Sequence, residues 1–588
     1  MSPKVMRTKL LLVVSAAAVL ALPALAQQGA QPQPTPAPAP VANTTGTAPS
    51  SLTTGPGESE TAVEELSAEA LQLQPPAPPV EIPSFARRDP WVVGRLDPVV
   101  IGIGPSPWRA VSGIYLQSLM RHMDTPLASR WVHIALRNAL LAKVQAPRGI
   151  HPVDWVAERA WLLLRMGEAD AARMLVSGVD VDRFTPKLFQ VAVQSALANA
   201  DPPGLCPLEE GIRKYDPQIR ELVSAMCASL SGEPESAAAQ VDHARRFGRI
   251  GGIDLTLAEK VVGAGANTGR AVTIEWDPVD HLTAWRFGLA TATGMTPPDR
   301  LMKDATPRLR AFQARSPLLG PQDRLETARI ATALGVFSSQ ALVDLYSAIY
   351  DSTDPGDLPE TDAWQLRQAF VGKDRDARLA AMRRLLDKAN GRVEKEAARA
   401  LIARAATLID PDPEIADDAP ELIAAMLAAG YDRQAARWIP AVRRMDGNNA
   451  DRCWAMLALA AADPRGLDMS LARINGFIGR DRSDGRVRSS LLVAGLAGLG
   501  RISGDAANAI NRRYGLGLGR VTSWTRMIDA AAAREQAGTV LIMTGTGFQT
   551  PQFKDVPGSH LYHSVAGLVR TRQDFTARMI AAEALART

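Results

Sequence analysis

Cysteine, histidine and aromatic residues are scarce in this 588-residue sequence, which has three cysteines, seven histidines and an aromatic content of 5%. The histidines are scattered, and only His560 and His563 lie close together, without a third ligand nearby. A zinc site needs more protein ligands than this pair supplies, so we predict no metal site. Few aromatic residues together with abundant Ala and Leu favour packed helices over β-architecture.

The sequence also lacks the common catalytic and cofactor-binding motifs. The segment "GAGANTG" places Gly263, Gly265 and Gly269 at the wrong spacing for a dinucleotide loop, and "MTGTGFQTP" has no phosphate-binding lysine. No G-x-S-x-G elbow is present. We therefore predict no cofactor and no catalytic residue.

Some enzymes of the cell wall, the lytic transglycosylases, carry helical superstructures beside a catalytic domain. Lytic transglycosylases resemble one another around a Glu-Ser pair at the end of an apolar helix. Here Glu58-Ser59 lies in a Pro-rich region and Glu235-Ser236 at a polar turn. A glycan-processing cell-wall enzyme or accessory, with an active site that these motifs do not reveal, is kept as the alternative function.

Charge of either sign is not in large excess, with 66 basic against 62 acidic residues. The full sequence has a net charge of +4, and removing the three basic residues of the N-terminal leader leaves about +1. A nucleic-acid-binding protein usually carries a concentrated basic surface. The balanced composition predicts no nucleic-acid partner.

The N-terminus has the pattern of an export signal. Lys4, Arg7 and Lys9 precede an apolar run from Leu10 to Ala21, and small residues occupy positions 24 and 26. Twelve apolar residues are too few for a helix that crosses a bilayer, which needs about 20. We expect cleavage after Ala26, no membrane span in the mature chain, and a periplasmic or secreted protein.

Residues 27–88 form a Pro/Ala-rich tail or linker that is expected to be disordered. Within it, "TAVEELSAEALQL" places four residues on one helical stripe, namely Val63, Leu66, Ala70 and Leu73. The stripe is either a transient helix or a docking motif. As a docking motif it would occupy the protein's own groove or contact another envelope protein.

Beyond Pro90 the apolar spacing is helical almost throughout, after an extended segment at 91–108. Ala-rich helices are predicted to end at five glycines, each followed five or six residues later by an alanine of the next helix. The glycines are Gly167, Gly232, Gly335, Gly430 and Gly500, and the alanines are Ala172, Ala237, Ala341, Ala435 and Ala506. Glycine permits the left-handed end of a helix, and alanine allows close approach. The fold class is therefore all-α, built from αα-hairpins.

At these turns the chain resembles degenerate tetratricopeptide repeats, and as a whole it is similar to uncharacterised exported helical proteins of proteobacteria. The resemblance implies an αα-hairpin solenoid that binds a protein or peptide. Gly/Pro-rich breaks divide it into an N-terminal lobe (89–246), an irregular connection with some helix (247–300) and a C-terminal lobe (301–588).

Two of the three cysteines, Cys206 and Cys227, are predicted to form a structural disulfide. A short helix from Pro207 to Lys214 and a second helix after Pro217 would form a hairpin that places the two cysteines at similar heights. Cys453 lies on an apolar helical face and is expected to remain a buried, reduced thiol.

These features together predict an exported helical-repeat scaffold that binds a protein or peptide partner in the cell envelope. The sequence identifies neither the partner nor the oligomeric state.

Overall fold

The computed structural model describes residues 83–215, 217–248, 250–266, 272–303 and 305–588. The predicted signal sequence, most of the predicted tail, and the predicted docking residues Val63, Leu66, Ala70 and Leu73 lie outside the described residues. Within the described ranges the chain is almost entirely helical, so the predicted all-α class is confirmed.

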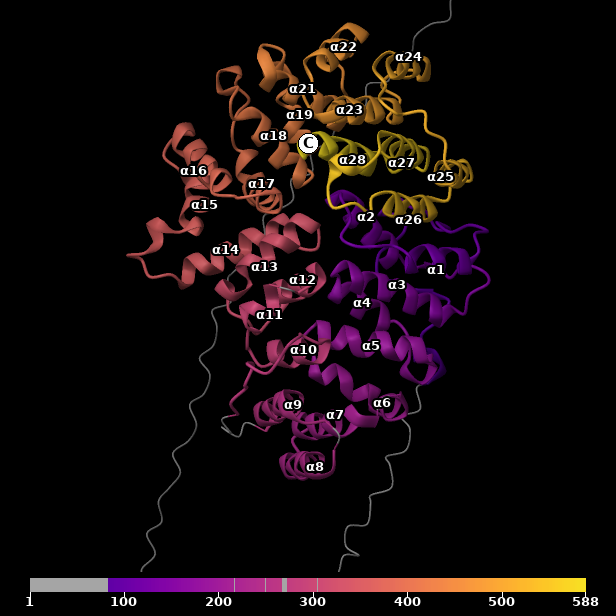
Figure 1. The fold of residues 1–588 in the computed structure, drawn as a ribbon, viewed down its shortest axis with the longest axis vertical. Coiled ribbons are helices and arrows are strands. Elements are labelled where there is room, and N and C mark those ends of the chain that lie inside the picture. The colour runs from indigo at the N-terminus through magenta and orange to yellow at the C-terminus, as the bar shows by residue number, and fades with distance from the viewer. Residues whose placement is uncertain (1–82, 216, 249, 267–271, 304) are drawn as a thin grey trace, which may run out of the picture. The chain divides into compact units, whose positions relative to one another are not determined.

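The first part of the chain runs from α1 to α14 (Figure 1). Its helices are α1 (Gly113–Arg121), α2 (Arg130–Leu141), α3 (Pro152–Met166), α4 (Ala169–Val176), α5 (Pro186–Ala198), α6 (Glu209–Tyr215), α7 (Pro217–Leu230), α8 (Pro234–Phe247), α9 (Gly252–Gly265), α10 (Ala284–Ala292), α11 (Asp299–Lys303), α12 (Pro307–Arg315), α13 (Pro321–Leu334) and α14 (Ser339–Ser352).

The second part continues to α28 and lines the cavity described below. Its helices are α15 (Asp362–Val371), α16 (Arg375–Asp387), α17 (Arg392–Ala406), α18 (Ala419–Ala428), α19 (Asp432–Ala436), α20 (Ile439–Val442), α21 (Gly447–Ala460), α22 (Leu471–Arg480), α23 (Val487–Gly498), α24 (Gly504–Tyr514), α25 (Ser523–Ala533), α26 (Ala537–Gly547), α27 (Gly558–Arg570) and α28 (Asp574–Ala586).

Short 3-10 turns connect several of these helices. They are η1 (Ser84–Ala86), η2 (Val181–Arg183), η3 (Pro202–Leu208), η4 (Leu358–Glu360), η5 (Pro413–Ile415), η6 (Asp484–Arg486) and η7 (Phe553–Asp555). In the predicted extended segment, strand β1 is only Val92–Val93, and it pairs antiparallel with β2 (Val144–Gln145). Buried Arg159 fixes this corner by donating to the carbonyls of Val93, Leu140 and Ala142.

The five predicted glycine turns are confirmed. Each glycine follows a helix by one or two residues and has a positive φ, between 67° at Gly500 and 96° at Gly335. The alanines of the second helices are fully buried at Ala172, Ala237 and Ala435. The first position of each turn favours glycine because its backbone is left-handed. The alanine position needs a small side chain because a neighbouring helix approaches closely.

Helices that are distant in sequence also pack together. α2 contacts α26 and α28 as well as α13, and α1 contacts α26 (Figure 1). A linear repeat array makes contacts only between neighbouring units, so these contacts are additional to hairpin stacking. One contiguous hydrophobic core consequently extends from Val93 to Ala584.

Two buried charged residues hold α2 among these distant helices. The Glu583 carboxylate of α28 accepts hydrogen bonds from the first turn of α2, namely from the Ser129 hydroxyl, Arg130 N (2.8 Å) and Trp131 N (3.2 Å). The Arg130 side chain donates to carbonyls that end α13 and α18, at Thr332 (2.9 Å) and Ala428 (3.1 Å). Helix ends leave such groups without intrahelical partners, so both side chains satisfy atoms that would otherwise be buried and unbonded.

The cysteine hairpin differs in part from its prediction. Residues 202–208 form the 3-10 turn η3, and the α-helix begins only at Glu209, two residues later than predicted. Prolines at 202, 203 and 207 lack the N–H groups that a regular α-helix would use there. The structure nevertheless brings Cys206 and Cys227 together, with Cα atoms 5.6 Å apart.

We expect the two cysteines to be joined by a disulfide when the protein folds under oxidising conditions. A Cα separation of this size lies in the range that a disulfide spans. Non-reducing peptide mapping should recover the peptides that contain Cys206 and Cys227 as one linked species. Recovery of both thiols in alkylated, unlinked form would contradict the bridge.

Cys453 is expected to react slowly with alkylating reagents in the native state. Its side chain is fully buried in α21, and burial raises the pKa of its thiol to about 12, so little thiolate forms at neutral pH. Labelling should become fast only after denaturation. Rapid modification of the folded protein would show that α21 opens readily.

Candidate functional site

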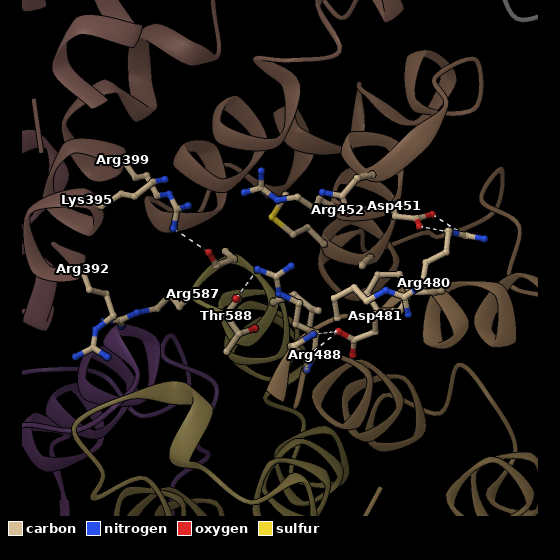
Figure 2. Close-up of a pocket in the computed structure, with 18 of the residues that line it drawn as sticks. Arg392, Lys395, Arg399, Asp451, Arg452, Arg480, Asp481, Arg488, Arg587 and Thr588 are labelled. Atoms are coloured by element: carbon tan, nitrogen blue, oxygen red, sulfur yellow. Dashed lines mark hydrogen bonds and ion pairs between the residues drawn. The ribbon is translucent and has the colours of Figure 1, made fainter. Parts of the chain in front are cut away.

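A large cavity lies where α17, α21, α22 and the last turn of α28 converge. Its volume is about 1020 Å³, at the upper end of the range for ligand pockets. The turn between α22 and α23, residues 481–486, completes its wall. Figure 2 shows its labelled residues, most of which are charged.

Basic side chains outnumber carboxylates in the lining of this cavity. Eight basic residues contribute, namely Arg392, Lys395, Arg399, Arg452, Arg480, Arg482, Arg488 and Arg587. The four acidic residues are Glu396, Asp451, Asp481 and Asp484. A concave surface with an excess of one charge concentrates its field and attracts ligands of the opposite charge. We refer to this site as the arginine cavity.

Behind the cavity wall, three of these cations share one carboxylate. Glu421 of α18 accepts from Arg399 (2.8 Å) and Arg452 (3.0 Å), and Lys395 lies 3.5 Å away. Burial by itself would raise the pKa of Glu421, but the hydrogen bonds and charges of Arg399, Lys395 and Arg452 outweigh it and lower the pKa to about 2. Glu421 is therefore a structural anion that holds the basic wall together.

A substitution of Glu421 by Gln is expected to destabilise the protein more near pH 7 than near pH 3. Because the pKa of Glu421 is lower in the folded protein than its ordinary 4.5, its contribution is complete above pH 4.5 and is lost as the pH falls toward 2. We expect a contribution of about 2 kcal/mol, after an allowance for solvent screening. Urea unfolding of both proteins at the two pH values measures it. An unchanged difference between the proteins would contradict the assignment.

Two other carboxylates in the cavity are also engaged. Asp451 accepts from Arg473 and Arg480, each at 2.6 Å, as Figure 2 shows for Arg480. Asp481 accepts from the backbone N–H and hydroxyl groups of Ser483 and Ser489, at 2.6–2.9 Å. Burial tends to raise the pKa of Asp481, whereas these hydrogen bonds lower it, and the net shift is downward. Asp481 thus fixes the turn that carries Arg482 and its junction with α23, where Arg488 lies.

Two arginines of the cavity have only backbone carbonyls as hydrogen-bond acceptors within the described part of the chain. Arg392 donates to Pro551 O (2.9 Å) and Arg482 to Gly479 O (3.3 Å). Neither has a carboxylate side chain of the described residues within ion-pair distance of 4.0 Å. Burial, followed by the nearby charge of Arg587, lowers the pKa of Arg392. We call Arg392 and Arg482 the open arginines. Arg488, in contrast, donates to an oxygen of Thr588, the last residue of the sequence (2.6 Å).

The backbone of the turn adds a second unusual feature. Gly485 and Arg486 both have positive φ, 59° and 54°, in the left-handed region. A non-glycine residue in this region is uncommon, and such conformations cluster at functional sites. The Arg486 guanidinium lies 5.5 Å from the centre of the Tyr514 ring, which helps to hold the conformation.

The structure does not bring the predicted site residues into this cavity. Cys206 and Cys227 lie in the η3–α7 hairpin, and the docking stripe is outside the described residues. The sequence analysis missed the arginine cavity, although "GRDRSDGRVR" at 479–488 carries four arginines in ten residues. The positions 392, 395 and 399 also fall on one helical face. Both signals are hidden by the acidic residues interspersed with them.

His560 and His563, the two histidines that lie close together in the sequence, are outside the arginine cavity. His560 lies against Gly547 O (3.2 Å) and stacks on Trp524, and His563 faces Asp529 (2.8 Å). No group of three metal-ligating side chains occurs among the residues with assigned structure.

Among the residues that the structure describes, no helix has the length and apolar character needed to cross a bilayer.

Comparison of this chain with protein-family models, with curated proteins and with solved structures finds no match. The geometry of the arginine cavity is therefore the main indication of function.

Proposed function

We propose that this protein is an exported helical-repeat scaffold that binds an anionic region of a protein or peptide partner in the arginine cavity. The observation that carries the proposal is the presence of two open arginines in one concave site that is lined by eight basic and four acidic residues. An arginine whose acceptors are backbone carbonyls retains its full charge, and it can exchange a neutral hydrogen bond for a stronger one to a carboxylate or phosphate.

The scaffold part of the proposal rests on helical hairpins like those of tetratricopeptide repeats. The five left-handed glycine turns and the buried alanines that follow them support this relationship. The cell-envelope location rests on the N-terminal sequence, which has the pattern of an export signal. Proteins of this architecture commonly present concave surfaces to peptide partners, which supports the proposal by analogy.

The experiment compares partner capture by the mature wild-type protein and by the double variant R482Q/R488Q, using envelope extract and quantitative mass spectrometry. The variant should lose most of the partner that the wild type captures, because it removes one open arginine and a second cation from the same wall of the cavity. R465Q is the matched control, since Arg465 is highly exposed and pairs with Asp463 outside the cavity lining. Equal capture by the wild type and the double variant would reject the proposed site.

A further inference from the structure

We infer that the arginine cavity recognises an acidic peptide segment in which Asp or Glu residues flank a large apolar side chain. The inference rests on the proposed function for its biological setting, but it concerns the chemistry of the ligand. It follows from the distribution of open charge, apolar surface and fixed backbone in the cavity.

The open arginines lie on two sides of the cavity. Arg392 begins α17, whereas Arg482 belongs to the turn between α22 and α23. A guanidinium binds a carboxylate through two parallel hydrogen bonds, so each side can hold one acidic residue. One small anion could engage only one side, whereas a peptide can present carboxylates to both.

Apolar side chains also line the cavity. Leu585 of α28 is partly exposed there, whereas Met456 of α21 and Phe477 of α22 reach it with little of their surface, at 2% and 7% exposed. A ligand that places an apolar side chain on this surface removes it from water, at about 25 cal/mol per Å² buried. Inorganic phosphate and bare sugar phosphates have no group that would gain this energy.

The acidic residues of the lining argue against a dense polyanion. Asp484 and Asp451 would repel closely spaced phosphates, and the net positive charge of the lining is modest. A membrane surface presents its charge on a plane, whereas the cavity is recessed between four helices. A peptide with a few carboxylates fits both the charge and the shape.

The turn that carries Arg482, and the first residues of α23 that carry Arg488, are already ordered for binding. The Asp481 carboxylate accepts four hydrogen bonds from Ser483 and Ser489, and Arg488 N donates to the Ser483 hydroxyl (3.1 Å). A prearranged turn loses less conformational entropy on binding than a flexible one. Asp481 is accordingly a positioning residue for the two arginines.

The test measures fluorescence anisotropy of defined peptides with the purified mature protein. The acidic probe is fluorescein-labelled Ser-Glu-Glu-Phe-Glu-Glu-Ser with an amidated C-terminus. One comparison peptide has every Glu replaced by Gln, and another has Phe replaced by Ser. We expect each change to weaken binding about tenfold or more, since one removes the charge-assisted hydrogen bonds and the other the apolar contact. R482Q should weaken binding of the acidic probe several-fold.

The variants keep the test informative even if one folds poorly. Arg482 is exposed and makes a single long hydrogen bond, so R482Q should retain the melting temperature of the wild type. R465Q should bind the acidic probe as the wild type does. The inference is overturned if the Gln peptide binds equally well, if the acidic probe does not bind, or if R482Q leaves its affinity unchanged. Displacement of the probe by phosphatidylglycerol vesicles or by about 10 mM inorganic phosphate would likewise overturn it, and would identify a lipid or phosphate ligand.

The outcomes separate the two proposals. If the acidic probe binds as expected but R482Q/R488Q still captures the cellular partner, the ligand chemistry holds and the partner uses another surface. If the double variant loses the partner while the acidic and Gln peptides bind alike, the cavity is the partner site and the ligand chemistry is wrong.

Discussion

Replacing Glu583 by alanine is expected to lower the free energy of unfolding by about 4 kcal/mol, the middle of the range for breaking a buried charged interaction. The substitution leaves the Ser129 hydroxyl and the N–H groups of Arg130 and Trp131 without their acceptor, in a region closed to water. Arg587, which donates to the same carboxylate at 2.7 Å, also loses a partner.

The charge of Arg130 increases this effect. Burial lowers the pKa of Arg130 to about 10, so the side chain remains protonated at neutral pH, and Glu583 is the first of the charges that favour this state. The substitution therefore removes both the acceptor at the start of α2 and the nearest compensation for a buried cation.

Thermal and urea unfolding of Glu583→Ala measure the loss. Glu535→Ala serves as the matched control, because the Glu535 carboxylate is exposed and its ion pair with exposed Arg109 should contribute at most about 1 kcal/mol. Hydrogen exchange should accelerate first in α2 and α28. Similar stability of the two variants would show that these hydrogen bonds do not hold α2 in place.

Gly288→Ala is expected to cost about 3 kcal/mol, because α5 and α10 touch through the backbone at this glycine. A Cβ atom at position 288 would lie 2.7 Å from the carbonyl oxygen and 2.9 Å from the Cα of Leu197. Backbone atoms inside a helix cannot rotate away as a side chain can, so the two helices must separate. Overpacking of this kind typically costs about 1–3 kcal/mol, and we expect the upper end here.

The control for this substitution is Gly504→Ala at the start of α24. A Cβ atom there has no neighbour within 4 Å, and alanine loses less backbone entropy on folding than glycine. Gly504→Ala should therefore be neutral or slightly stabilising. Gly288→Ala should lower the melting temperature and accelerate hydrogen exchange in α5 and α10. Equal melting temperatures for the two variants would contradict the close contact of these helices.

Local features of the fold were predictable from sequence because they depend on neighbouring residues. A glycine that follows an apolar helix, with an alanine five or six residues later, specifies a hairpin turn through backbone sterics alone. The start of the Cys206 helix was predicted less well. Pro207 indicates a helix start, but Pro202 and Pro203 extend a 3-10 turn through it.

The arginine cavity could not be predicted in the same way. Its wall combines residues 389–399, 447–456, 477–488 and 585–588, which are brought together only by tertiary packing. Which arginines remain open depends on where Glu421, Asp451 and Glu583 lie in space, and sequence spacing does not contain that information. The contacts of α2 with α26 and α28 are also non-local, so helical periodicity indicates that α2 has an apolar face but not what covers it.

The hydrogen bonds between Glu583 and the start of α2 join residues 453 positions apart in the chain. Contacts of such sequence separation form late, because the entropy of closing so long a loop must be overcome before any of them is gained. On a ribosome, α2 therefore emerges long before its acceptor is synthesised. A ribosome-bound chain therefore keeps the start of α2 without its native acceptor until α28 has been synthesised, and the N-terminal helices complete their packing only after that point.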